Sequence, residues 1–371
     1  MKYQLARRLV HLMERDVPIR STQSASGFAV GSLRGPVRED NQDRALVADV
    51  SGEDGLSARV GIVCDGLGGM TSGGLAASWA ASVFLAEIVA RISDFSKDSL
   101  AEAVRQANDV VFRQFGGEGG TTLTALVSFN NGANWVVHVG DSRLYIIDEN
   151  NALKLLTVDD TVVGVANNGS IDEDLLDNRL LQFVGVGDDI EPHIFLVHDS
   201  ENYDFILTSD GAHTLGRKLL EDIVLKTSKP VDWVKRIIYV SDAIGVTDNA
   251  TALAISSDSI ALQPSFDEGI CLKVWTANDV LELWLQDNIP ERKHREFLSP
   301  KSVVKDVMDS SAVLETTILS PEPEPEPEAK PKRTPKPKPV VEKDQLATDG
   351  SESASRPQLS IKFDDESNSK K

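Results

Sequence analysis

Short runs of apolar and β-branched residues recur along the middle of the chain, and they predict β-strands. These runs cluster in groups and do not alternate regularly with helical patterns, which favours antiparallel sheets with helices on their faces over a doubly wound parallel sheet. The predicted strands are Arg59–Cys64, Thr121–Ser128, Asn134–Val139, Arg143–Ile147 and Asp204–Thr208.

Two segments between these strands have the pattern of helices. Gly73–Ile92 is rich in alanine, and Ser99–Phe115 opens with a Ser99-Leu-Ala-Glu102 sequence that predicts a capping box. The longest apolar run, 76–90, is interrupted by two serines and a glutamate, so no membrane-spanning helix is expected. The first 20 residues lack a continuous apolar stretch, so no secretory signal is expected either.

The chain divides into four predicted segments: an N-terminal extension (1–24), one α/β domain (25–257), an extension whose structure the sequence leaves undecided (258–320) and a tail (321–371). Within the extension, 270–286 fits two structures. It is either a hairpin that turns at Ala277-Asn278-Asp279, or a strand followed by a helix capped by Thr276.

The tail begins PEPEPEPEAKPKRTPKPKP at Pro321. Because proline lacks a backbone N–H and restricts its neighbours, this composition predicts a disordered or polyproline-II segment. Further on, Leu359, Ile361 and Phe363 alternate with polar residues, a pattern that could dock on the sheet edge of a partner. Chance alternation in an unstructured terminus is the other interpretation.

The charge excludes some partners. The chain has 38 basic and 58 acidic residues, a formal net charge of −20. Phosphate backbones and anionic lipid surfaces attract clustered Lys and Arg, so neither nucleic acid nor a membrane is expected as a partner. Only two cysteines are present, Cys64 and Cys271, too few for a disulfide framework; a cytoplasmic location is the simplest expectation.

Four aspartates stand beside Gly, Asn or Gln at predicted chain reversals: Asp43, Asp65, Asp210 and Asp248. Each alone is an ordinary turn residue. Together, at the ends of stiff strands, carboxylates of this kind could hold hard divalent cations, which prefer oxygen ligands.

Seven short pieces of sequence follow one another in a fixed order from Arg38 to Thr251. The pieces are Arg38-x-x-Asn-Gln-Asp43, Asp65-Gly-Leu-Gly-Gly69, Gly120-Thr-Thr122, Val139-Gly-Asp-Ser-Arg143, Leu156-Thr157, Ser209-Asp-Gly211 and Asp248-Asn-Ala-Thr251. This ordered set resembles the metal-dependent protein phosphatases of the 2C type (the PPM family), most closely the bacterial serine/threonine phosphatases.

The resemblance implies an α+β fold, a four-layer αββα sandwich of two antiparallel sheets flanked by helices. It also implies two Mn²⁺ or Mg²⁺ ions that share a bridging hydroxide, which hydrolyses phosphoserine and phosphothreonine in proteins and so opposes a kinase. The residues it assigns are Asp65 as the ligand of both metals, Asp210 and Asp248 as ligands of one, the Gly66 carbonyl and neighbouring Asp43 for the other, and Arg38 for the substrate phosphate.

The chain also departs from the family pattern. Leu67 occupies the position of a histidine that can protonate the leaving group, so the general acid is left open, with His213 the nearest histidine to a motif. Asp141 matches a third-metal ligand, but Thr214 replaces its acidic partner, which makes a third site doubtful. The segment 162–189 corresponds to the family's flap. These departures leave an alternative function, a catalytically weak or silent scaffold that binds a signalling partner.

Overall fold

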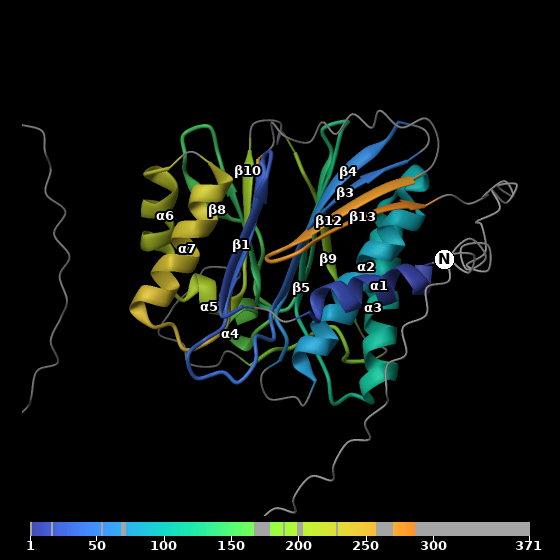
Figure 1. Cartoon of the computed structure of the whole chain (residues 1–371), viewed down its shortest axis with the longest axis horizontal. Coiled ribbons are helices and arrows are strands. Elements are labelled where there is room, and N and C mark those ends of the chain that lie inside the picture. Colours follow the sequence, from blue (N-terminus) through green and yellow to red (C-terminus); the bar gives the residue numbers. More distant parts are fainter. Residues whose placement is uncertain are drawn as a thin grey trace, which may run out of the picture. The chain divides into compact units, whose positions relative to one another are not determined.

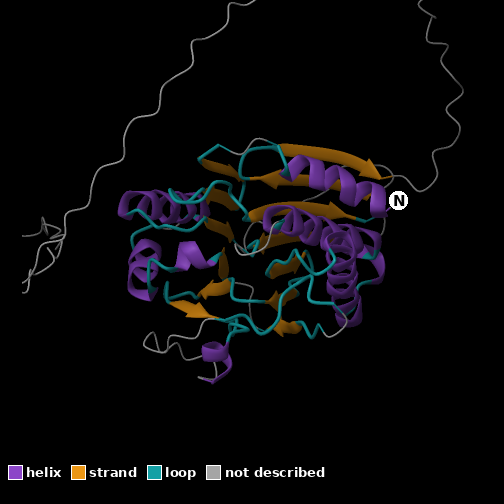
Figure 2. Ribbon diagram, turned by 90° about the horizontal axis from the view of Figure 1, so that it is seen from below, coloured by secondary structure: helices purple, strands orange, loops and turns teal. Residues whose placement is uncertain are grey.

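Two antiparallel sheets lie face to face, and helices cover both outer faces, as Figures 1 and 2 show. The computed structural model describes residues 2–15, 18–52, 55–67, 72–166, 179–187, 190–198, 203–227, 229–256 and 270–285. The four-layer αββα sandwich expected from the sequence is confirmed. The proline-rich tail with Leu359, Ile361 and Phe363, the segments 258–269 and 286–320, and most of the expected flap (167–178) lie outside the described residues.

The first sheet has six strands and the second has seven. In order across the first sheet the strands are β1 (Arg20–Ala25), β2 (Phe28–Leu33), β11 (Ala250–Ile255), β10 (Asp204–Thr208), β7 (Arg143–Ile147) and β8 (Leu153–Leu155). In the second they are β13 (Val280–Leu285), β12 (Ile270–Thr276), β3 (Arg44–Ser51), β4 (Ser57–Cys64), β5 (Leu123–Phe129), β6 (Asn134–Val139) and β9 (His193–Val197).

Most strands are buried on both faces, which explains their continuous apolar runs. In β2, Phe28 and Val30 enter the core between the sheets, while Ala29 and Leu33 face the helices on the outer side. Trp275 of β12 packs edge-on against Phe28 in the same inner core, with ring centroids 4.8 Å apart. The inner core therefore fixes the spacing of the two sheets, and with it the spacing of the loops at their ends.

The helices form the two outer layers. Helices α1 (Lys2–Met13), α2 (Gly73–Ala90) and α3 (Lys97–Phe115) pack on the seven-stranded sheet, and α5 (Asp210–His213), α6 (Arg217–Leu225) and α7 (Pro230–Ile244) pack on the six-stranded one; the short α4 spans Val162–Ala166. By length and composition alone α2 could cross a membrane, but 89% of it is buried inside the described fold, as befits a core helix.

Two local predictions are resolved by the structure. The capping box at Ser99 is wrong: α3 begins earlier, because Ser96 has an extended backbone and its Oγ accepts the N–H of Ser99 at 3.2 Å. The segment after 270 forms the hairpin of the two alternatives. Its turn is closed by the Thr276 N–H, which donates to the Asp279 carbonyl at 2.9 Å, and β12 adds the hairpin to the sheet beside β3.

Candidate active site

A cavity of about 340 Å³ lies where several strands of both sheets end. The loops that reach it follow β2, β4, β6 and β10 and precede β11, and antiparallel pairing brings these strand ends to the same edge of the sandwich. It brings together every site residue expected from the sequence except Asp43. The lining residues are Arg38, Gln42, Asp65, Gly66, Leu67, Thr122, Asp141, Leu180, Asp210, Asp248 and Asn249.

The turn that carries Asp65 is held by the Gly-Thr-Thr motif. The Asp65 carbonyl accepts the N–H of Thr122 and the hydroxyl of Thr121, both at 2.9 Å, and the Asp65 N–H donates to Thr122 Oγ1 at 2.8 Å. Gly66 is required because a Cβ there would lie 2.4 Å from the carbonyl carbon of Gly73. The Asp65 carboxylate is therefore presented by a turn with little freedom to move.

Asp43 lies behind the cavity wall and does not line the cavity. Its carboxylate is buried, and Oδ2 accepts the hydroxyl of Ser209 at 2.7 Å. Its Oδ1 has no hydrogen-bond partner among the described residues. A buried carboxylate oxygen without a donor is costly, so a cation or a water at this atom would be stabilising.

Arg38 and Asp248 form an ion pair at the cavity, with Nη2 donating to Oδ2 at 2.5 Å. Both side chains keep about a third of their surface exposed, at 36% and 33%. The neighbouring Asn249 ties the two loops together, because its Oδ1 accepts the N–H of Gly35 at 3.1 Å. The arginine and the carboxylate thus sit side by side, each with a free face toward the cavity.

The carboxylates raise one another's pKa values. Burial first, and then repulsion from Asp210 and Asp248, raises the pKa of Asp43 to about 7. Burial, with repulsion from Asp210 and Asp159, raises the pKa of Asp141 to about 7. The pKa values of Asp65 and Asp210 are also raised, mainly by burial and secondarily by the other acids. A positive charge bound among these groups would relieve both costs.

The oxygen donors at the cavity suit a divalent cation by their chemistry, although their side chains are not yet arranged around one point. Among the described residues, no three His, Cys, Asp or Glu side chains already stand close enough together to hold an ion. The donor set nonetheless has the chemistry of a hard-cation site, because it offers carboxylates, a glycine carbonyl and an unpartnered buried oxygen. One of these carboxylates, that of Asp248, is paired with Arg38.

No histidine is among the residues that line the described cavity; Leu67 is there instead. His213 lies in α5, where its Nδ1 is 3.2 Å from Thr208 Oγ1. Burial, aided by the positive charge of Arg143, holds the pKa of His213 well below the ordinary value, so its imidazole is neutral. His213 is also not among the residues that line the cavity. Thr214 donates its hydroxyl to the Asp210 carbonyl at 2.8 Å and leaves Asp141 without a second carboxylate at that position.

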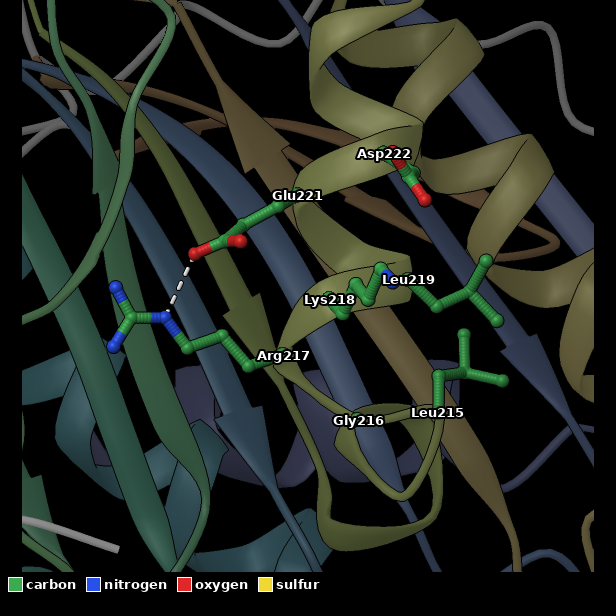
Figure 3. Close-up of a pocket in the computed structure, with 7 residues that line it drawn as sticks. All are labelled: Leu215, Gly216, Arg217, Lys218, Leu219, Glu221 and Asp222. Atoms are coloured by element: carbon green, nitrogen blue, oxygen red, sulfur yellow. Dashed lines mark hydrogen bonds and ion pairs between the residues drawn. The ribbon is translucent and has the colours of Figure 1, made fainter.

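A larger hollow of about 850 Å³ lies at α6 (Figure 3). Leu215 and Leu219 lie side by side there, and Arg217 pairs with Glu221 across 2.7 Å. None of the expected site residues lines it, and its charged groups are the ordinary complement of an exposed helix.

Sequence reasoning assigned no role to three lining residues. Thr122 and Asn249 stand inside the matched motifs, and Asn249 directly follows Asp248, which was the available signal. Leu180 belongs to the expected flap segment and reaches the cavity through an antiparallel bridge between Leu180 and Thr161. No local pattern marks Leu180 in advance.

The chain is 31% identical to the PPM Ser-Thr phosphatase MsPP from Mycobacterium smegmatis, whose crystal structure in complex with cacodylate matches with a TM-score of 0.53 over 63% of this chain and 99% of that one. The chain therefore belongs to the PPM family of Ser/Thr phosphatases. Serine/threonine phosphatase Stp1 from Staphylococcus aureus, 18% identical with a TM-score of 0.53 over 65% of this chain and 98% of that one, shares the fold.

Among curated proteins, the serine/threonine protein phosphatase PstP of Mycobacterium tuberculosis is 27% identical over 244 residues, 61% of this chain. The chain spans 44% of the length of PstP. No family model matches the chain.

Proposed function

We propose that the protein is a Mn²⁺- or Mg²⁺-dependent phosphatase of phosphoserine and phosphothreonine in proteins. The observation that supports this most strongly is the convergence of Asp65, Asp141, Asp210 and Asp248 with Arg38 on one cavity, from five separate loops. Family membership supports the same activity, whereas the scaffold alternative gains no support. A silent scaffold has no use for a cluster of carboxylates that repel one another.

In this proposal Asp65, Asp210 and Asp248 and the Gly66 carbonyl hold two divalent cations, with Asp43 behind them. Bound there, the cations supply Lewis-acid activation of water and neutralise the phosphoryl oxygens. A third ion at Asp141 is not part of the proposal, because Thr214 offers no carboxylate. The rigid turn at Asp65 would keep its carboxylate in place for the cations.

Arg38 binds the phosphate of the substrate. Its planar guanidinium can donate two parallel hydrogen bonds to phosphate oxygens, which lysine cannot do. Asp248 Oδ2 now accepts from Arg38 Nη2, so engagement of Asp248 by a cation would free that N–H for the substrate. Leu67 provides no proton, so water or another group at the cavity must protonate the leaving oxygen.

The wider setting follows from the activity. The substrates are phosphorylated proteins, and the enzyme opposes a serine/threonine kinase. Cys64 is buried and Cys271 half-buried, and both are free thiols, which fits a reducing compartment such as the cytoplasm.

Hydrolysis of p-nitrophenyl phosphate and of phosphothreonine and phosphotyrosine peptides, with Mn²⁺ or with EDTA, tests the proposal. We expect Mn²⁺-dependent turnover of the ester and of the phosphothreonine peptide, and little of the phosphotyrosine one. Stoichiometric Mn²⁺ binding without any turnover would favour the scaffold instead.

A further inference from the structure

Arg44, the first residue of β3, clamps the loop that precedes it. Its Nη1 donates to the carbonyl of Asn41 at 2.6 Å and to that of Asp43 at 2.9 Å. Gln42, between these two carbonyls, lines the cavity, and its own carbonyl lies against Gly66. The loop that carries Arg38, Gln42 and Asp43 is thus fixed at its end by one guanidinium.

The other side of the same guanidinium is anchored by the N-terminal extension. Nη2 donates to Glu14 Oε1 at 2.9 Å, Nε donates to Ser78 Oγ at 2.8 Å, and the Ser78 hydroxyl in turn donates to Glu14. Glu14 directly follows α1, and Ser78 lies on α2. The Arg44 side chain is only 11% exposed, so these bonds compete little with water.

Helix α1 determines where Glu14 stands. Leu5, Leu9 and Leu12 bury the helix in the core beside α2. At its other end Lys2 pairs with Glu87 at 2.8 Å, and Tyr3 stacks on Trp79 with ring centroids 5.9 Å apart. A displacement of α1 would therefore move Glu14 and release one side of Arg44.

We propose that Glu14 and Arg44 are a positioning pair through which helix α1 holds the loop Asn41–Asp43 in the geometry that binds metal. The inference rests on the proposed function, since the loop matters through the cations that the cavity beside Gln42 and Asp43 would hold. Neither residue lines the cavity. Arg44 acts through the backbone that it holds, and only a planar fork with several donors can bind two carbonyls, a hydroxyl and a carboxylate together.

The test compares Glu14→Gln with Arg15→Gln in the full chain. Arg15 follows Glu14 directly and pairs with Asp279 in the hairpin turn, so its variant removes an ion pair of the same helix end without touching the loop. Mn²⁺ binding by titration calorimetry, the half-saturating Mn²⁺ concentration for p-nitrophenyl phosphate hydrolysis and the unfolding temperature are measured for both.

We expect Glu14→Gln to weaken Mn²⁺ binding by about threefold to tenfold, part of the effect of a charged hydrogen bond, and Arg15→Gln to leave it within about twofold. Arg44→Lys should cause a smaller further loss of Mn²⁺ affinity in the Glu14→Gln protein than it causes in the wild type, because the two residues act as one unit. Ser78→Ala, like Glu14→Gln, should weaken Mn²⁺ binding.

Equal Mn²⁺ affinity in the Glu14→Gln, Ser78→Ala and wild-type proteins would overturn the inference, as would equal losses in the two charge variants. If Glu14→Gln is too unstable to assay, the Ser78→Ala result decides. A wild-type protein that neither binds Mn²⁺ nor hydrolyses the ester would refute the proposed function, which is a distinct outcome.

Discussion

Arg38 shows what a sequence reveals about a single residue and what it hides. The motif around it predicts a phosphate-binding arginine, and its charged neighbours in sequence, Glu39 and Asp40, are the obvious alternative partners. In the fold its partner is Asp248, 210 positions away. The pairing of β2 with β11, which aligns Leu33 with Ala250, brings the two loops together. No local pattern contains that information.

Asp210→Asn should remove nearly all activity while leaving the fold intact. The change keeps the volume of the side chain but deletes a charge from a cluster of acids around one cavity. We expect less than a tenth of the wild-type rate, a loss of at least ~1.4 kcal/mol of transition-state stabilisation. Turnover of p-nitrophenyl phosphate and Mn²⁺ titration check this. Full activity at ordinary Mn²⁺ concentrations would contradict the assignment of Asp210 as a ligand.

Arg38→Ala should raise the KM for the phosphoester and leave Mn²⁺ affinity nearly unchanged. Arg38 lines the cavity but offers no oxygen ligand to a cation. Its pKa is raised chiefly by its hydrogen bond to Asp248. Arg38→Lys is the matched variant, because it keeps the charge without the planar fork. Steady-state kinetics and calorimetry separate the two effects. A large loss of Mn²⁺ affinity in Arg38→Ala would show that the arginine supports the metals instead.

At the scale of elements, the sequence located five of the thirteen strands that the described residues form, because these five are conspicuous apolar runs of strand length. The predictions for 134–139, 143–147 and 204–208 match β6, β7 and β10 end to end. The sequence missed six strands, and it also misplaced an end where two serines compete for the N-cap of α3, at Ser96 and Ser99. The missed strands are β1, β2, β3, β8, β9 and β11. The pairing order of the sheets, and thus which loops meet, could not be read from local patterns.

Asp160 should stabilise the turn that carries Asp141. Its buried carboxylate accepts the N–H of Gly140 at 2.8 Å, Gln182 Nε2 at 2.8 Å and, at 2.7 Å, is paired with His193 Nε2. It therefore joins the β6–β7 turn to the segment with Leu180 and to β9. Asp160→Asn should lower the free energy of unfolding by about 1–3 kcal/mol, because buried donors lose a charged acceptor.

Urea denaturation of Asp160→Asn, beside Asp109→Asn as the control, measures that effect. Asp109 pairs with Arg113 on the exposed side of α3 at 3.3 Å, and its loss should change stability by at most about 0.5 kcal/mol. Equal stability of the two variants would show that Asp160 is dispensable to the turn.

For the whole molecule, the described residues that line the cavity all fall between Arg38 and Asn249. Truncation after Leu319 should therefore leave p-nitrophenyl phosphate hydrolysis within about twofold of the full chain, as is usual for removal of a terminus that carries no site residue. Replacement of Leu359, Ile361 and Phe363 by Ser tests the docking prediction through recovery of bound partners. Loss of small-substrate activity on truncation would show instead that the tail contributes to the site.

The acidic cluster should make the metal-free protein less stable as the pH rises. The raised pKa values of Asp43 and Asp141, each about 7 in the fold, mean that the folded protein holds these protons more tightly than the unfolded chain, where aspartate titrates near 3.8. A raised pKa contributes stability that is complete below the unfolded value and is lost as the pH rises through the folded one. In EDTA we therefore expect the unfolding temperature to fall between about pH 4 and pH 7.

Thermal unfolding of the wild type and Asp43→Asn across this range, in EDTA and in Mn²⁺, isolates the effect. The difference in unfolding temperature between the two proteins cancels the titration of other groups. In EDTA, the unfolding temperature of Asp43→Asn should rise relative to that of the wild type as the pH rises. Mn²⁺ should raise the unfolding temperature of the wild type most at neutral pH, because the ligands must be deprotonated to bind it. If the difference in unfolding temperature stays constant with pH in EDTA, Asp43 keeps an ordinary pKa. A cation would then relieve no charge repulsion at Asp43.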